Sequence, residues 1–145
     1  MRDRVLVMHG INLDALDRRP AEHYGGLTYT QLEMRIGQFG RELSLQVSFF
    51  QSNHEGEFVE ELHKAPDYAD GLLLNPGAWT HYAWSLRDAV EISGLPVVEV
   101  HLSDVDAREP FRRLSVLEDV RIGKVAGKGV EGYREGLELL KAEFA

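Results

Sequence analysis

Cysteine is absent from the 145 residues of this chain. Its absence excludes disulfide bonds, thiolate nucleophiles and cysteine metal ligands, and it fits a protein of the reducing cytoplasm. No apolar run approaches the roughly 20 residues of a membrane span, and the apolar part of MRDRVLVMHG is too short for a signal peptide. We therefore expect a cytoplasmic protein that has no membrane association.

An excess of positive charge is also missing. The chain has 16 Lys and Arg against 24 Asp and Glu, a net charge of -8 at pH 7. This balance argues against general nucleic-acid binding, although a few local arginines could still bind a small anion. With 43% hydrophobic and 28% charged residues the composition is globular, and the length predicts a single catalytic domain over residues 1–145.

Short apolar runs alternate with stretches of helical periodicity. Leu32, Ile36 and Phe39 share one helical face, and Thr28 with Gln31 predicts a capping box at the start of that helix. Strands are expected at residues 4–8, 45–50, 71–74, 96–100 and 124–126; helices at 28–43, 57–65, 82–93 and 130–144; and a short turn or helix at 108–115. This order predicts an α/β fold with a flavodoxin-like, doubly wound, five-stranded parallel sheet.

Polar clusters follow the first four predicted strands. They begin at His9, Gln51, Asn75 and His101 and consist mostly of amide, hydroxyl and imidazole side chains. Ligands of doubly wound sheets bind at the carboxyl ends of the strands. We therefore expect a polar active site at this edge, with ordinary loop polarity as the alternative interpretation.

Two charged pairs stand out. Glu99 and His101 lie two residues apart on a strand and point to the same face, and a carboxylate that orients an imidazole suits a general acid. Arg108 and Arg112 lie four residues apart, so they would share a helical face and could bind a carboxylate. A surface ion pair and a solvated basic face are the respective alternatives.

Other chemistries find less support. His9, His54, His81 and His101 lie at strand ends, but no pair has the i, i+4 spacing of a helical zinc motif. The HGIN turn lacks the glycines and the lysine of a phosphate-binding loop. None of the four lysines ends one of the first four strands, which disfavours a Schiff base.

One ordered set of motifs runs over nearly the whole chain. It comprises Asn12-Leu13, Arg19, Tyr24-Gly25, Gln51-Ser52-Asn53, Glu55-Gly56, Asn75-Pro-Gly-Ala78, Thr80-His81, Leu86-Arg87-Asp88-Ala89, Glu99-Val-His101-Leu-Ser103, Arg108-Glu109, Phe111-Arg112 and Gly132-Tyr133. In order and spacing this set resembles the type II 3-dehydroquinate dehydratases. The resemblance implies a trans-elimination of water from 3-dehydroquinate to 3-dehydroshikimate through an enolate, in the shikimate pathway, with no metal or organic cofactor.

The resemblance also implies the catalytic residues. Tyr24 would take the proton alpha to the ketone, and Arg19, on a mobile lid, would favour the tyrosinate together with Arg108. Asn12 would hold the water or side chain that stabilises the enolate. His101, oriented by Glu99, would protonate the departing hydroxyl. Such an elimination needs a base, an acid and donors near the enolate charge, which these residue types supply; Arg18 is expected to be solvated.

Substrate contacts follow from the same resemblance. Asn75, His81 and Arg112 would bind hydroxyl groups, and the backbone N–H groups of Leu102 and Ser103 would bind the carboxylate. Asp88 would reach the site of a neighbouring subunit, because the family assembles as trimers packed into a dodecamer.

The chain departs from the family pattern near the first loop and the lid. The usual Asn-Gly-Pro-Asn-Leu-Asn stretch reads HGINLD at residues 9–14, which places His9, Ile11 and Asp14 at the changed positions. Asp17 replaces a glycine and Asp104 an asparagine. Two alternatives therefore stay open, a divergent paralogue acting on a related cyclic hydroxy-acid and a non-catalytic binding protein. The sequence also leaves open whether the pathway is biosynthetic or breaks down quinate.

Overall fold

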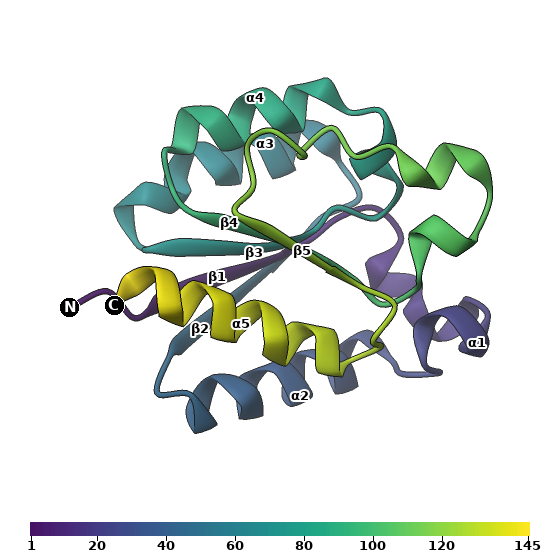
Figure 1. The fold of residues 1–145 in the computed structure, drawn as a ribbon, viewed down its shortest axis with the longest axis horizontal. Coiled ribbons are helices and arrows are strands. Elements are labelled where there is room, and N and C mark those ends of the chain that lie inside the picture. Colours follow the sequence, from purple (N-terminus) through teal and green to yellow (C-terminus); the bar gives the residue numbers. More distant parts are fainter.

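The protein folds around a five-stranded sheet, shown in a computed structural model that describes residues 1–145 (Figure 1). The strands are β1 (Arg4–His9), β2 (Gln46–Gln51), β3 (Gly71–Asn75), β4 (Val97–His101) and β5 (Gly123–Ala126). Their order in the sheet is β2-β1-β3-β4-β5, and every neighbouring pair is parallel. This is the flavodoxin-like order that the sequence predicts, and the fold prediction is confirmed.

Two layers of helices cover the sheet. Helices α2 (Tyr29–Glu42) and α5 (Glu131–Phe144) pack on one face, and α3 (Glu55–Lys64) and α4 (Trp84–Ser93) on the other (Figure 1). Along β1 the side chains of Val5 and Val7 enter the first layer and those of Leu6 and Met8 the second. Burial on both faces explains why the central strands β1 and β3 contain continuous apolar runs.

The predicted helices are largely confirmed, with two shifted starts. Thr28 and Gln31 exchange both hydrogen bonds of the capping box, at 3.1 and 3.0 Å. The helix expected from residue 57 already begins at Glu55, since a carboxylate in the first turn is stabilised by the helix dipole. The helix expected from residue 82 begins only at Trp84, because Tyr82 and Ala83 have non-helical backbone angles.

The structure also contains short helical turns, most of which the sequence did not predict. They are α1 (Ala21–Tyr24) and the 3₁₀ turns Leu13–Arg18, Ala65–Asp67, Gly77–His81 and Val105–Ala107; the turn Pro110–Arg113 falls inside the expected segment 108–115. Segments of three to six residues are too short to show helical periodicity. Apart from Ala65–Asp67, these turns lie at the carboxyl edge of the sheet, where they carry or flank candidate site residues.

The loops after β1 and β3 approach each other closely at Gly10. A Cβ atom on Gly10 would lie 2.3 Å from the carbonyl oxygen of Pro76, so only glycine permits this approach. Its N–H donates to the carbonyl of Asn75 at 2.8 Å. This contact fixes the two loops relative to each other at the edge where polar residues gather.

No helix in the structure is both long and apolar enough to cross a membrane.

Candidate active site

A cavity of about 180 Å³ opens at the carboxyl edge of the sheet. Ten of the twelve site residues predicted from the sequence line it: Asn12, Arg19, Tyr24, Asn75, His81, His101, Leu102, Ser103, Arg108 and Arg112. No aspartate or glutamate is among the lining residues, whereas three arginines are. The cavity is therefore cationic within a chain of net charge -8, and it suits an anionic ligand.

Tyr24 is the residue on which two of these arginines converge. Arg19 Nη2 and Arg108 Nη1 donate to the Tyr24 hydroxyl oxygen at 2.5 and 2.7 Å. The guanidinium carbon of Arg19 also lies 4.3 Å from the centre of the tyrosine ring. Arg18, in contrast, is exposed. The Tyr24 hydroxyl oxygen therefore lies between two guanidinium groups, at hydrogen-bonding distance from both.

Local backbone geometry brings Arg19 and Tyr24 together. Arg19 is extended at the end of the turn Leu13–Arg18, and Tyr24 is the last residue of α1. Gly25 and Gly26 follow with φ angles of 77° and 71°, a left-handed conformation that ends the helix and favours glycine. The arginine and the tyrosine therefore lie on two turns joined only by Pro20.

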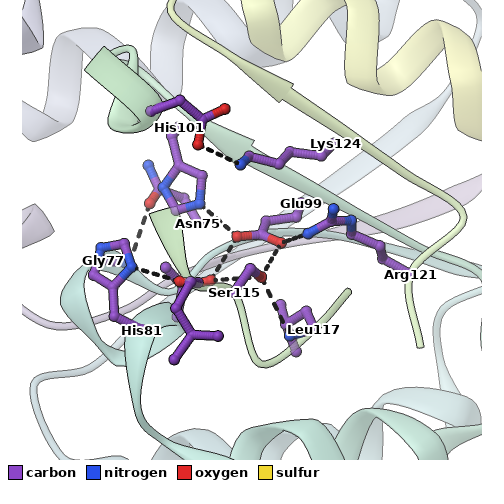
Figure 2. Close-up of polar contacts among 12 residues, drawn as sticks. Asn75, Gly77, His81, Glu99, His101, Ser115, Leu117, Arg121 and Lys124 are labelled. Carbon is purple, nitrogen blue, oxygen red and sulfur yellow. Dashed lines mark hydrogen bonds and ion pairs between the residues drawn. The ribbon is translucent and has the colours of Figure 1, made fainter. Parts of the chain in front are cut away.

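His101 is held from behind by Glu99 (Figure 2). His101 Nε2 lies 2.6 Å from Glu99 Oε2, and the Glu99 side chain is fully buried. Since Nε2 contacts the carboxylate, Nδ1 is the nitrogen that remains without a partner in the chain. Lining the cavity, His101 is an imidazole of fixed orientation with one nitrogen free for a ligand.

Three further side chains saturate the Glu99 carboxylate. Thr80 Oγ1 donates to Oε2 at 2.5 Å, Ser115 Oγ to Oε1 at 2.7 Å and Arg121 Nη1 to Oε1 at 2.7 Å. Burial by itself would raise the pKa of Glu99, but the hydrogen bond and charge of His101, with the two hydroxyls, hold it well below its ordinary value. Glu99 therefore stays anionic although no water reaches it.

Sequence reasoning missed Ser115 and Arg121 and gave Thr80 no role. Both missed residues lie in the irregular segment between β4 and β5, 16 and 22 positions from Glu99. The one available signal was the buried carboxylate itself, because a buried charge requires partners. Nothing in the spacing says which residues supply them.

His81 is positioned by a backbone carbonyl. Its Nδ1 donates to the Leu114 carbonyl at 2.8 Å, which leaves Nε2 as an acceptor. Burial, as the largest cause, lowers the pKa of His81 and keeps the ring neutral.

The backbone of Leu102 and Ser103 is held by the loop after β5. The Leu102 and Ser103 carbonyls accept from Gly129 and Gly127 N–H at 3.2 and 3.0 Å. In a trans peptide the N–H of Ser103 points opposite to the Leu102 carbonyl, away from that loop.

The departure at Asp14 has a structural role. Its carboxylate accepts from Asn53 Nδ2 at 3.1 Å, and Asn53 Oδ1 accepts from the backbone N–H of Asn12 at 2.8 Å. Asn12 itself has a φ of 71°, which asparagine tolerates better than most residues. Asp14 and Asn53 thus hold the backbone of Asn12 in place at the rim of the cavity.

His9, one of the residues that differ from the family pattern, lies beneath the cavity. His9 is fully buried, and its Nδ1 and Nε2 each lie 3.0 Å from a tyrosine hydroxyl, those of Tyr29 and Tyr133. Burial lowers the pKa of His9 to about 3, so the ring is neutral near pH 7. His9 is therefore a hydrogen-bonding residue of the interior rather than a residue that meets the ligand.

Asp88 lies outside the cavity of its own chain. Its side chain is 69% exposed on α4 and pairs with Arg87 at 3.2 Å. Its predicted contact with a neighbouring subunit therefore stays a prediction.

No group of three or more His, Asp or Glu side chains is placed to hold a metal ion.

The fold and the cavity are those of an α/β enzyme with side chains suited to acid–base chemistry on a small anion. The cavity combines a tyrosine flanked by arginines with a carboxylate-oriented histidine, on separate segments of the chain. Residues 3–141 match the model of the family "Dehydroquinase class II". The chain belongs to this family.

Individual relatives agree with the family match. A 3-dehydroquinate dehydratase of Bacillus licheniformis is 47% identical over 130 residues, covering 90% of each chain. That of Bacillus subtilis is 44% identical over 138 residues, covering 95% of this chain and 93% of the relative. The crystal structure of type II dehydroquinase from Butyrivibrio crossotus superposes with a TM-score of 0.91 at 37% identity, covering 96% and 97% of the two chains.

The buried neutral His9 predicts a specific pH dependence of stability. In the unfolded chain it takes up a proton near its ordinary pKa of 6.5, but in the folded protein only near pH 3. Between these values the unfolded state binds the additional proton, so stability falls as the pH falls. Its share of the slope is about 1.4 kcal/mol per pH unit.

Urea denaturation at fixed protein concentration and a series of pH values measures this effect. His9→Gln retains hydrogen-bonding groups but cannot be protonated, so its stability should depend less steeply on pH between about 6 and 3. Parallel curves for the wild type and the variant would contradict the assignment.

Proposed function

We propose that this protein is a type II 3-dehydroquinate dehydratase, a hydro-lyase of the shikimate pathway. Its reaction removes water from 3-dehydroquinate in a trans sense and yields 3-dehydroshikimate. The observation that carries the proposal is the Tyr24 hydroxyl between two guanidinium groups, in a cavity that also holds His101 and no carboxylate. The family match and the relatives' activity support the choice of substrate.

Tyr24, as a phenolate, is the proposed base that takes the proton alpha to the ketone. One unit charge at about 4 Å stabilises another by on the order of 4 kcal/mol at an effective dielectric of about 20. Desolvation of the phenolate opposes this gain, so two cations are more effective than one. Arg19 and Arg108 supply them at hydrogen-bonding distance.

The electrons of the broken C–H bond form an enolate, and Asn12 would hold the water or side chain that stabilises it. Collapse of the enolate forms the C=C bond and expels the hydroxyl group, which receives a proton from His101 and leaves as water. Glu99 keeps the imidazole oriented through its contact with Nε2, which leaves Nδ1 to face the substrate. Proton exchange with solvent then returns Tyr24 and His101 to their starting states.

Substrate binding is assigned to the remaining lining residues. Asn75, His81 and Arg112 would bind hydroxyl groups, His81 through its free Nε2. The backbone N–H groups of Leu102 and Ser103 would bind the carboxylate, which the cationic cavity attracts. The proposed reaction needs no cofactor, and the cytoplasm is the compartment that we predict for it.

The function is tested by following the ultraviolet absorbance of the conjugated product from 3-dehydroquinate. Tyr24→Phe removes only the hydroxyl oxygen, and it should lower turnover at least 100-fold, because general-base catalysis is lost. Substrate should still bind, as measured by calorimetry. A folded wild-type protein without activity would favour the divergent paralogue, and a variant retaining more than about a tenth of turnover would exclude Tyr24 as the base.

The two neighbouring arginines provide a matched comparison. Arg19→Ala removes one of the two donors to the Tyr24 oxygen and should lower turnover about tenfold to a hundredfold. Arg18→Ala removes the same charge one residue earlier from an exposed position, and turnover should change less than about twofold. Equal losses in both variants would show that net charge, rather than contact with Tyr24, sets the rate.

We further propose that the chain assembles as trimers, packed into a dodecamer. Along α4, Trp84, Asp88 and Ile92 recur every four residues and form one outward stripe. The side chains of Trp84 and Ile92 are 59% and 69% exposed, and Tyr82 beside them is 58% exposed. An exposed apolar stripe of this kind supports an interface, and it would carry Asp88 towards a neighbouring subunit.

Light scattering at micromolar concentration should therefore report a symmetric, trimer-based oligomer. Trp84→Glu should weaken it, because a charge would be buried at the interface. Met34→Glu is the matched control, since Met34 is 68% exposed on α2. A monomeric wild type, or equal behaviour of the two variants, would exclude this interface and the proposed reach of Asp88.

A further inference from the structure

A chain of hydrogen bonds leads from the cavity into the interior of the protein. Asn75 Nδ2 donates to the Tyr133 hydroxyl oxygen at 2.9 Å, and this oxygen lies 3.0 Å from His9 Nε2. His9 Nδ1 lies 3.0 Å from the Tyr29 hydroxyl. The four residues come from β3, α5, β1 and α2 in turn. Tyr133 and His9 are fully buried, so no water competes for these contacts.

The chemistry of the partners determines where each proton lies. An amide nitrogen of asparagine can only donate, so the Tyr133 oxygen must accept from Asn75. The single Tyr133 proton then has one acceptor in reach, His9 Nε2. The neutral ring of His9 therefore carries its proton on Nδ1 and donates it to the Tyr29 oxygen. The chain has a single direction from Asn75 to Tyr29.

The other end of the Asn75 amide is fixed as well. Its Oδ1 accepts from the Gly77 N–H at 3.2 Å (Figure 2). Exchanging the amide nitrogen and oxygen would place a donor against the Gly77 N–H and leave the Tyr133 oxygen without its donor. Asn75 therefore has one orientation, in which one N–H and one oxygen lone pair remain for a ligand in the cavity.

We propose that Tyr133 and His9 are positioning residues that orient the Asn75 amide for substrate binding. The ligand group that Asn75 receives is then one that accepts a hydrogen bond and can donate one, as a hydroxyl group does. This inference rests on the proposed function only in taking the substrate as the ligand. The hydrogen-bond chain itself is a property of the free protein.

The protonation states of the two residues agree with this role. Burial raises the pKa of Tyr133 and lowers that of His9 to about 3. Both side chains are therefore neutral near pH 7, and neither contributes a charge beside the arginine-lined cavity. Protonation of His9 on Nε2 would remove the acceptor for the Tyr133 proton.

The first experiment needs no substrate. The ¹⁵N spectrum of histidine-labelled protein, with His9 assigned by its loss in His9→Gln, should show a neutral ring protonated on Nδ1. A His9 ring that carries its proton on Nε2 would overturn the proposed direction of the chain. This test of the hydrogen-bond direction is independent of the proposed function, because it requires no substrate.

The second experiment compares KM and kcat for 3-dehydroquinate. Tyr133→Phe removes one oxygen and should raise KM about tenfold, with kcat changed less than about twofold, because only ligand binding loses a fixed donor. Tyr68→Phe removes a hydroxyl that donates to Glu61 on the surface, and both constants should stay unchanged. A Tyr133→Phe enzyme with wild-type KM, or with a loss in kcat alone, would overturn the proposal.

A pair of His9 variants separates hydrogen bonding from packing. His9→Gln keeps an acceptor for the Tyr133 proton and should preserve a KM within about threefold of wild type, whereas His9→Leu fills the space without one and should raise KM about tenfold. Equal KM values in the two variants would overturn the role of His9. If Tyr133→Phe does not fold, the two His9 variants still test whether the hydrogen-bond chain orients the Asn75 amide.

Discussion

Parallel pairing of β1, β3 and β4 is the constraint on which the rest of the site depends. The register places His9 beside Asn75 at the ends of β1 and β3, and β4 ends at His101 on the same edge. Parallel strands all deliver their carboxyl ends to one side, so residues far apart in the chain meet there. The close approach of Gly10 to Pro76 then fixes the loops after β1 and β3 against each other.

Charge is distributed in two layers at this edge. The cavity wall carries Arg19, Arg108 and Arg112 without any carboxylate, and the anionic Glu99 lies behind His101, out of reach of a ligand. An anionic substrate thus meets cations first. The negative charge that the histidine requires is kept in the interior, where hydroxyl groups and Arg121 satisfy it.

The interior beneath the site is polar as well as apolar. Tyr133 belongs to the stripe of α5 that packs on the sheet with Leu137 and Leu140, yet its hydroxyl joins Asn75 to His9. A single residue can therefore serve the core with its ring and the site with its oxygen. His9, which departs from the family pattern, is accommodated because two tyrosine hydroxyls match its two ring nitrogens.

Patterns in the sequence were sufficient to predict the sheet, its strand order and most of the residues that line the cavity. Apolar runs, helical periodicity and the Thr28 capping box are local signals, and the spacing of motifs such as Glu99-Val-His101 carried the family resemblance. Three sets of contacts became apparent only in the folded chain: Arg121 and Ser115 with Glu99, Asp14 with the residue that holds Asn12, and His9 with Tyr133. These contacts join residues that are distant in the sequence or lie in irregular loops, and no periodicity encodes them. The demand of a buried polar group for partners can be read from a sequence, but the identity of the partners depends on which loops the fold brings together.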